Sequence, residues 1–289
     1  MPNATIFVKD WIECLKQCQS CSVQMGVSSP YYYGLRDYSA EGQGGLEETP
    51  ELYVKTLVEG FREFRRVLKD DGILFVNIGD SHYNYRPGKY VDGRRNTLQK
   101  NASHNRGLPT NSPKRKTKLV GFKEKDLMMI PALFAIAMRL DGWYLRSDII
   151  WYKKAPYPES VCDRPTRSHE HIFMFTKSPK YYCDLEAVKQ PTVDGKSMRR
   201  LHDVWIILPS KFKGGHFATY PDELPRRCIL MGSKVGDIVY DMFSGAGTTA
   251  KVALELGRDF IGSELNPDNA EMSKNRILES SPDSTVEMM

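Results

Sequence analysis

The sequence predicts an α/β protein with a Rossmann-like, doubly wound and mostly parallel sheet. Short apolar runs, such as 73–78 and 235–240, alternate along the chain with stretches that have the apolar spacing of helices. The second of these runs leads into a glycine-rich turn and then a helix, which is typical of nucleotide-binding α/β folds. The 289 residues are enough for one large domain, which we expect to span 1–280.

In the first part of the chain, the pattern alternates between apolar runs and helical spacing. Thr49 and Pro50 are typical of a helix start, because threonine caps free amides and proline fits the first turn. The polar run 69–72 predicts where that helix ends. The expected elements are an extended piece and a helix within 4–20, a buried strand over 22–27, a helix over 49–68 and a strand over 73–78.

The second part of the chain shows the same alternation. We expect a helix over 126–140, strands over 144–152 and 171–176, a short helix over 221–231, a strand over 235–240, a helix ending at Leu256, a strand over 260–262 and a helix over 268–278. The Ser/Pro/Asp-containing end, 281–289, is expected to be a flexible tail.

The positive charge is concentrated in one segment. The net charge is +5, but 86–125 holds 12 Lys or Arg residues and two acidic residues, so it carries about +10 and leaves the rest near −5. We therefore expect a basic insertion over 82–124 to contact a polyanion such as DNA. Our candidates for phosphate contacts are Arg94, Arg95, Lys114, Arg115 and Lys116.

No stretch of the sequence predicts membrane insertion. The longest apolar run, 127–140, is too short to cross a bilayer and contains Pro131 and Arg139. No charged-then-apolar signal begins the sequence. The expectation is a cytoplasmic protein of a bacterium, archaeon or phage, with no membrane partner.

Three of the six cysteines, Cys14, Cys18 and Cys21, have a C-x3-C-x2-C spacing. This spacing is similar to the cluster-binding motif of radical S-adenosylmethionine enzymes, where three thiolates hold iron and sulfur. The same positions also share one helix face, where free cysteine is a small buried apolar residue. We favour the second interpretation and expect no metal.

A stiff turn follows the strand over 22–27. Pro30 fixes a backbone torsion and favours an extended Ser29. The turn offers a hydroxyl from Ser29, backbone carbonyls and the flat ring of Tyr32. Oxygens that accept N–H groups beside an aromatic face can hold a planar ring that carries an amino group. The alternative is an aromatic turn that only packs on the core.

A glycine-rich turn near the other end predicts a cofactor site. Gly245 and Gly247 would let the backbone approach a ligand at a helix start. Glu264 ends the next predicted strand, where a carboxylate can accept from both ribose hydroxyls. These residues indicate a cofactor that contains adenosine, and NAD remains open at this point.

Both motifs have counterparts in one family. Residues 29–38 resemble the S-P-P-Y-x-G-L-R-D-Y box of amino-group DNA methyltransferases, and 241–249 resembles their D-x-F-x-G-x-G-T-T box. The catalytic box precedes the cofactor box, as in the circularly permuted β group, and the resemblance covers about 5–280. It implies a catalytic domain that binds S-adenosyl-L-methionine and modifies double-stranded DNA.

The resemblance also implies roles for individual residues. Ser29 and the Pro30 carbonyl would accept the amino N–H bonds of a flipped base, and Tyr32 would stack on it. Glu264 would bind the ribose, and Asp241 would lie beneath the sulfonium. The remaining implied cofactor contacts are Phe243, Ser244, Gly245, Gly247, Thr248 and Thr249.

One residue departs from the family pattern, and another indicates the target base. Tyr31 stands where the family has a second proline, which predicts a less rigid turn. Serine at position 29 favours N4 of cytosine, whereas an acid or amide there favours N6 of adenine, which is our alternative. We expect a small target-recognition segment over 184–215 that shares this work with 82–124.

Three other classes of protein remain possible from the sequence: an NAD-dependent oxidoreductase, a radical iron–sulfur enzyme and a non-enzymatic DNA-binding module. The glycine turn fits the first, the cysteines fit the second and the basic segment fits the third. The two boxes together favour a site-specific DNA methyltransferase. Its expected partner is a cognate restriction endonuclease that acts on the same DNA site. The sequence leaves the oligomeric state open.

Overall fold

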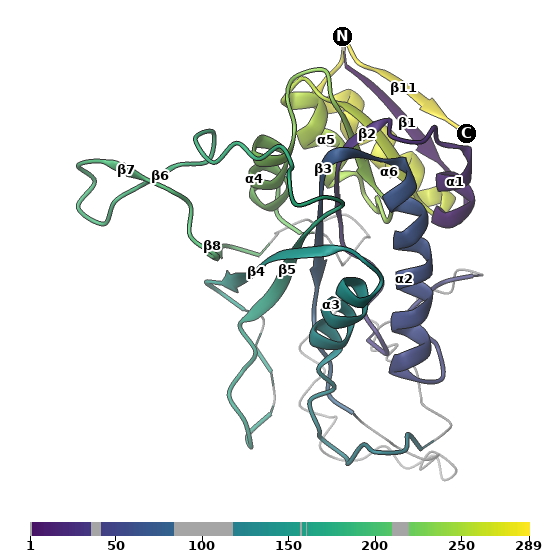
Figure 1. The fold of residues 1–289 in the computed structure, drawn as a ribbon, viewed down its shortest axis with the longest axis vertical. Coiled ribbons are helices and arrows are strands. Elements are labelled where there is room, and N and C mark those ends of the chain that lie inside the picture. Colours follow the sequence, from purple (N-terminus) through teal and green to yellow (C-terminus); the bar gives the residue numbers. More distant parts are fainter. Residues whose placement is uncertain (1, 36–41, 84–117, 157, 160, 210–219) are drawn as a thin grey trace.

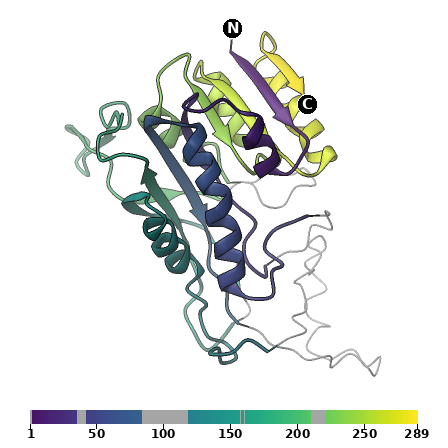
Figure 2. The ribbon, with the colours of Figure 1, turned by 45° about the vertical axis from the view of Figure 1, so that its right-hand side comes forward.

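A nine-stranded sheet organises the protein (Figure 1). The computed structural model describes residues 2–35, 42–83, 118–156, 158–159, 161–209 and 220–289. The strand order is β11-β1-β10-β9-β2-β3-β5-β4-β8. One face packs against α1, α2 and α3 around an aromatic core, and the other packs against α4, α5 and α6 (Figure 2). This arrangement confirms the predicted α/β, mostly parallel sheet.

The strands and helices alternate through most of the chain. The strands of the sheet are β1 (Asn3–Phe7), β2 (Val23–Ser28), β3 (Leu68–Ile78), β4 (Tyr144–Lys153), β5 (His169–Thr176), β8 (Val204–Ile207), β9 (Ile238–Asp241), β10 (Asp259–Ser263) and β11 (Thr285–Met288). The helices are α1 (Trp11–Gln17), α2 (Pro50–Val67), α3 (Ile130–Leu140), α4 (Glu223–Gly232), α5 (Thr248–Glu255) and α6 (Pro267–Ser280).

The direction of the strands brings distant segments to one edge. From β11 to β3 every neighbouring pair is parallel, so β2 and β9 end side by side. Strand β5 runs antiparallel to β3 and β4, and therefore begins at the edge where β3 ends. The loops after β2, β3 and β9 consequently meet the first residues of β5, which positions the candidate site.

Two predicted boundaries move in the structure. Strand β3 starts at Leu68, because the polar residues 69–72 continue the strand instead of separating it from α2. Helix α3 starts at Ile130 and not at 126, because the preceding backbone pairs with the segment after β3, where Met128 N donates to the Ser81 carbonyl. Asp80 then accepts from Ile130 N and serves as the missing cap of α3.

The predicted flexible tail is wrong for 285–288. These residues form β11, which pairs in parallel with β1. Val286 packs against the core beneath the sheet, and Met289 N donates to the Ile6 carbonyl. A free sheet edge thus gains a strand because its backbone donors and acceptors find partners there.

The two segments expected to contact DNA are only partly described. Residues 84–117, with Arg94, Arg95, Lys114, Arg115 and Lys116, lie outside the described residues, as do 210–219. Within 184–209, β6 (Gln190–Pro191) and β7 (Met198–Arg199) form a small hairpin that projects beyond the β8 edge of the sheet (Figure 1). Among the helices that the structure describes, none could cross a bilayer.

Candidate active site

A buried hydrogen-bond network joins the two sequence motifs. Ser28 ends β2 and Asp241 ends the neighbouring β9, and the Ser28 hydroxyl donates to Asp241 Oδ1 at 2.5 Å. Phe243 N lies 3.2 Å from Ser28 Oγ and 3.1 Å from Asp241 Oδ1. The serine turn and the glycine turn, which are 213 residues apart at this contact, therefore lie against one another.

Asp241 is held by protein donors on both carboxylate oxygens. Tyr220 and Thr249 donate their hydroxyls to Oδ2, opposite the Ser28 bond to Oδ1. The side chain is 1% exposed, and burial raises the pKa of Asp241 while these hydrogen bonds oppose the rise. This residue, predicted to bind the cofactor, is placed to align the two turns.

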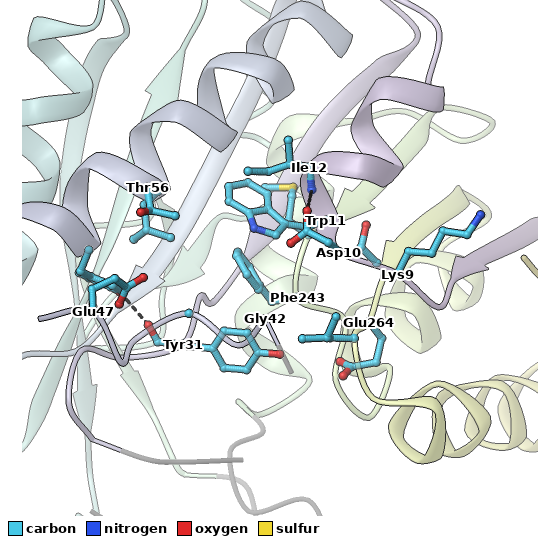
Figure 3. Close-up of a pocket in the computed structure, with 16 residues that line it drawn as sticks. Lys9, Asp10, Trp11, Ile12, Tyr31, Gly42, Glu47, Thr56, Phe243 and Glu264 are labelled. Carbon is cyan, nitrogen blue, oxygen red and sulfur yellow. Dashed lines mark hydrogen bonds between the residues drawn. The ribbon is translucent and has the colours of Figure 1, made fainter. Parts of the chain in front are cut away.

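A pocket opens beside this junction (Figure 3). Phe243 lies between the rings of Trp11 and Tyr31, with ring centroids 4.9 Å and 5.6 Å away. The Trp11 ring can pack beside Phe243 because Gly60 on α2 has no side chain. A Cβ at Gly60 would lie 2.8 Å from Trp11 Cζ3. The pocket is also lined by Lys9, Asp10, Ile12, Met242, Ser263, Glu264 and Leu265.

Glu264 places a buried carboxylate in this pocket, which Asp10 and Glu47 also line. Its oxygens accept from Gly245 N at 2.8 Å and from Asn266 N at 2.8 Å. Gly245 has a φ of 51°, which favours glycine and turns its amide towards Glu264. Burial raises the pKa of Glu264, and the hydrogen bonds to its oxygens oppose the rise.

The other residues of the glycine-rich turn have mainly structural contacts. Gly247 has a φ of 76°, and a Cβ there would lie 2.8 Å from Ser273 Cβ on α6. Thr248 accepts from Arg276, while Thr249 belongs to the Asp241 network. Ser244 Oγ is buried and has no hydrogen-bond partner among the described residues, and Ser244 is not among the residues that line the pocket.

On the other side of the junction, α2 holds the serine turn. Ser29 is half-buried and Pro30 is buried. The hydroxyl of Tyr53, on α2, donates to the Tyr31 carbonyl at 2.7 Å. This bond constrains the turn at the position where the expected second proline is missing.

Tyr32 is fixed at both its ring and its hydroxyl. A Cβ at Gly79, which follows β3, would lie 2.6 Å from Tyr32 Cε2. The hydroxyl donates to Glu170 Oε2 at 2.7 Å and lies 3.2 Å from Asn77 Oδ1. Ser29 Oγ donates to the same hydroxyl at 3.4 Å. Ser29, Pro30 and Tyr32 thus lie together in one turn.

The packing interpretation of the cysteine motif holds for Cys14 but not for Cys21, which lies beyond the end of α1. Cys14 is buried on α1, its thiol contacts the Lys9 carbonyl at 3.8 Å, and burial raises the pKa of Cys14 to about 11. Cys21 is exposed. In the part of the chain that the structure describes, no three His, Cys, Asp or Glu side chains gather as a group that could hold a metal ion.

Comparison with known proteins decides the family. Residues 23–275 match a family model described as DNA methylase, N6_N4_Mtase. The chain belongs to the N6/N4 DNA methylase family. The type II methyltransferase M.Cfr9I of Citrobacter freundii is 45% identical over 275 residues, which are 95% of this chain and 88% of the relative.

Two solved structures share the fold. TTHA0409 of Thermus thermophilus, complexed with S-adenosyl-L-methionine, has a TM-score of 0.69 and 25% identity, covering 100% of this chain and 98% of that one. The PvuII cytosine-N4-specific DNA methyltransferase has a TM-score of 0.70 and 19% identity, covering 97% and 88%. The family match and the 45% identity to M.Cfr9I together make this N6/N4 methylase a type II DNA methyltransferase, which argues against the oxidoreductase, iron–sulfur and non-enzymatic alternatives.

The cofactor of this methylase is S-adenosyl-L-methionine, and the pocket fits it chemically. Glu264 offers a carboxylate for ribose hydroxyls, while Trp11, Ile12 and Leu265 offer flat or apolar surfaces for adenine. The rings of Phe243 and Tyr31 can face a sulfonium cation.

Sequence reasoning missed several residues of the site. Asp10 and Trp11 follow β1, and their local sequence predicted an amphipathic helix but no part in the site. Tyr220 and Ser28 flank recognised segments but join the site only through Asp241. Asn77, Lys153 and Glu170 come from three different strands, and no local spacing connects them.

Proposed function

We propose that this enzyme moves a methyl group from S-adenosyl-L-methionine to the exocyclic N4 of a cytosine in double-stranded DNA. The observation that carries the proposal is that Ser29 directly follows the Ser28–Asp241 junction and that its hydroxyl contacts the Tyr32 hydroxyl. A serine hydroxyl there can accept an N–H bond while it donates its own proton elsewhere.

The residues act mainly by positioning the base. An amino nitrogen on an aromatic ring is a poor nucleophile, because its lone pair is delocalised. Ser29 Oγ and the Pro30 carbonyl accept its N–H bonds and favour the pyramidal form, in which the lone pair is free. Tyr32 stacks on a base that has been flipped out of the duplex, which costs a few kcal/mol of unstacking. Most of the rate enhancement then comes from alignment of the reacting atoms.

The cofactor side supplies the methyl group and the geometry. Bound S-adenosyl-L-methionine would supply a methyl group made electrophilic by the positive sulfonium. As the nitrogen–carbon bond forms, the sulfur–methyl bond would break to leave a neutral thioether, and the methylated nitrogen would lose one proton to water. Glu264 accepts from the ribose hydroxyls, and Asp241 keeps Phe243 and Ser28 in register through its hydrogen bonds. The same arrangement serves N6 of adenine, which is the second candidate because the family includes both activities. The PvuII enzyme supports the fold at 19% identity, so the base assignment depends on Ser29.

The basic segment provides the DNA contacts in this proposal. Arg94, Arg95, Lys114, Arg115 and Lys116 bind phosphates, which makes the affinity for DNA strongly salt-dependent. Residues 184–215 and 82–124 share target recognition. Since M.Cfr9I is a type II methyltransferase, a cognate restriction endonuclease is the partner expected to act on the same site.

Nucleoside analysis tests the proposal. The enzyme is incubated with duplex DNA and methyl-labelled cofactor, and the digested nucleosides are separated. We expect labelled N4-methylcytosine; N6-methyladenine would overturn the base assignment, and no labelled base would overturn the function. Ser29→Ala and Tyr32→Ala should each abolish transfer but retain cofactor binding, measured by calorimetry. Loss of that binding would contradict the assigned roles.

A further inference from the structure

A chain of hydrogen bonds runs from Ser29 away from the pocket. Ser29 Oγ donates to the Tyr32 hydroxyl at 3.4 Å, and that hydroxyl donates to Glu170 Oε2 at 2.7 Å. Burial raises the pKa of Tyr32 well above its usual value, so the phenol keeps its proton and remains a donor. Each hydrogen bond in this series therefore donates in one direction, from Ser29 through Tyr32 to the carboxylate of Glu170.

The carboxylate at the end of the chain is itself held in place. Lys153 Nζ forms an ion pair with the other oxygen, Glu170 Oε1, and the two side chains are 23% and 13% exposed. Asn77 Nδ2 donates to Glu170 Oε2 at 3.2 Å and to the His171 carbonyl at 3.1 Å. Three strands, β3, β4 and β5, thus converge on one acceptor beneath Tyr32.

This series of hydrogen bonds determines which groups Ser29 presents to a ligand. A hydroxyl that donates its single proton to a neighbour presents only lone pairs to the opposite side. Hydrogen bonds in series polarise each other, so a carboxylate two links away makes the first oxygen a better acceptor. The first link is long at 3.4 Å, as hydrogen bonds often are before substrate enters, and can shorten in the complex.

We propose that Glu170, held by Lys153 and Asn77, is a positioning residue that acts through the Tyr32 hydroxyl to keep Ser29 a hydrogen-bond acceptor for the amino group of the target base. Tyr32 then has two separable roles: its ring stacks on the base, and its hydroxyl transmits the polarisation. The inference rests on the proposed methyl transfer but holds for cytosine or adenine, because both present an amino group.

Substitutions at Tyr32 separate the two roles. Tyr32→Phe keeps the ring and removes the hydroxyl, so we expect kcat to fall about 10- to 100-fold, as for loss of a hydrogen bond to a charged group. The KM for S-adenosyl-L-methionine should stay within about twofold, because Tyr32 lies outside the cofactor pocket. Full kcat in Tyr32→Phe would overturn the inference.

Glu170 provides the second measurement. Glu170→Leu should lower kcat by a similar factor, and Glu170→Gln, which retains an accepting oxygen, should restore part of it. In the double variant with Tyr32→Phe, Glu170→Leu should cause little further loss, because both changes break the same chain. Fully additive losses would show that Glu170 acts independently of Tyr32 and would also overturn the inference.

Two controls protect the interpretation. Glu255→Gln removes a comparable, partly buried ion pair with Arg226 on the helices away from the site, and should change kcat by less than about twofold. Thermal unfolding of each variant identifies any that fail to fold. If the Glu170 variants fail to fold, the kinetics of Tyr32→Phe, which is the least disruptive change, decide whether the inference holds. If the wild-type enzyme labels no base, the proposed function fails; if it labels a base and Tyr32→Phe matches it, only this inference fails.

Discussion

The cofactor side and the base side of this active site are held by different kinds of contact. On the cofactor side, the turn is fixed mainly through its own backbone amides, with Gly247 N donating to the Ser244 carbonyl and Gly245 N to the side chain of Glu264, which follows β10. On the base side, Asn77 of β3 and Glu170 of β5 contact the Tyr32 hydroxyl, and Lys153 of β4 holds Glu170. Local sequence therefore specifies the first side, whereas the order of strands in the sheet specifies the second.

Asp241 belongs to both sides, so its substitution should have the largest effect. Asp241→Asn replaces one accepting oxygen with a donor, which leaves hydroxyls of Ser28, Thr249 or Tyr220 without an acceptor. We expect a loss of about 3 kcal/mol in the free energy of unfolding, from chemical denaturation, and at least a ~100-fold loss in kcat/KM.

The matched control for Asp241 is Asp222→Asn. Asp222 is 41% exposed and pairs with Lys251 on the surface, so its loss should cost under about 1 kcal/mol. Equal stability of the Asp241 and Asp222 variants would show that the buried network does not align the two turns.

Gly247→Ala perturbs the cofactor side alone. The new Cβ would lie 2.8 Å from Ser273 Cβ, and φ of 76° is unfavourable for alanine. We expect about 2–4 kcal/mol of destabilisation and a raised KM for the cofactor, from denaturation and steady-state kinetics. Gly236→Ala shares a positive φ of 83° but has open space around it, so it should cost only about 1 kcal/mol. Similar losses at both glycines would mean that contact with α6 is unimportant.

The same contrast explains how much could be predicted. The fold class, Gly245, Glu264, Ser29 and Tyr32 follow from patterns within short stretches of sequence. Glu170 is 138 residues from Tyr32, and only the antiparallel pairing of β5 with β3 brings them together.

Packing explains the remaining errors. Trp11 lines the pocket because Gly60 on α2 makes room for its ring, and α3 begins late because Asp80 caps it from the end of β3. The strand at 285–288 depends on an edge of the sheet that the local sequence does not show. Each of these outcomes depends on a partner far away in the chain.

Tyr53→Phe tests the base side at the turn itself. The change removes the hydrogen bond to the Tyr31 carbonyl and keeps the ring. We expect a loss of about 1 kcal/mol of stability and a several-fold lower kcat/KM, because the turn without its second proline loses its constraint. Tyr83→Phe removes a buried hydroxyl that accepts from Leu119 N, so it should cost similar stability without the kinetic effect. Identical kinetics of the two variants would contradict this role for Tyr53.

Glu264 gives the smallest and most specific effect, a pH dependence of cofactor binding. Burial raises its pKa above the ordinary 4.5, so its carboxylate becomes protonated on acidification earlier than an exposed glutamate would. The ionised form accepts from ribose hydroxyls, and we therefore expect cofactor affinity, measured by calorimetry, to fall as the pH drops through this raised pKa.

Stability without cofactor should change in the opposite direction. A carboxyl group whose pKa is raised in the folded state binds its proton more tightly there, so its stabilising contribution is complete below pH 4.5 and is lost as the pH rises through the raised pKa. Glu264→Gln cannot titrate and should flatten both profiles over this range. An unchanged pH profile of affinity in Glu264→Gln would assign the ribose contact to another residue of the pocket.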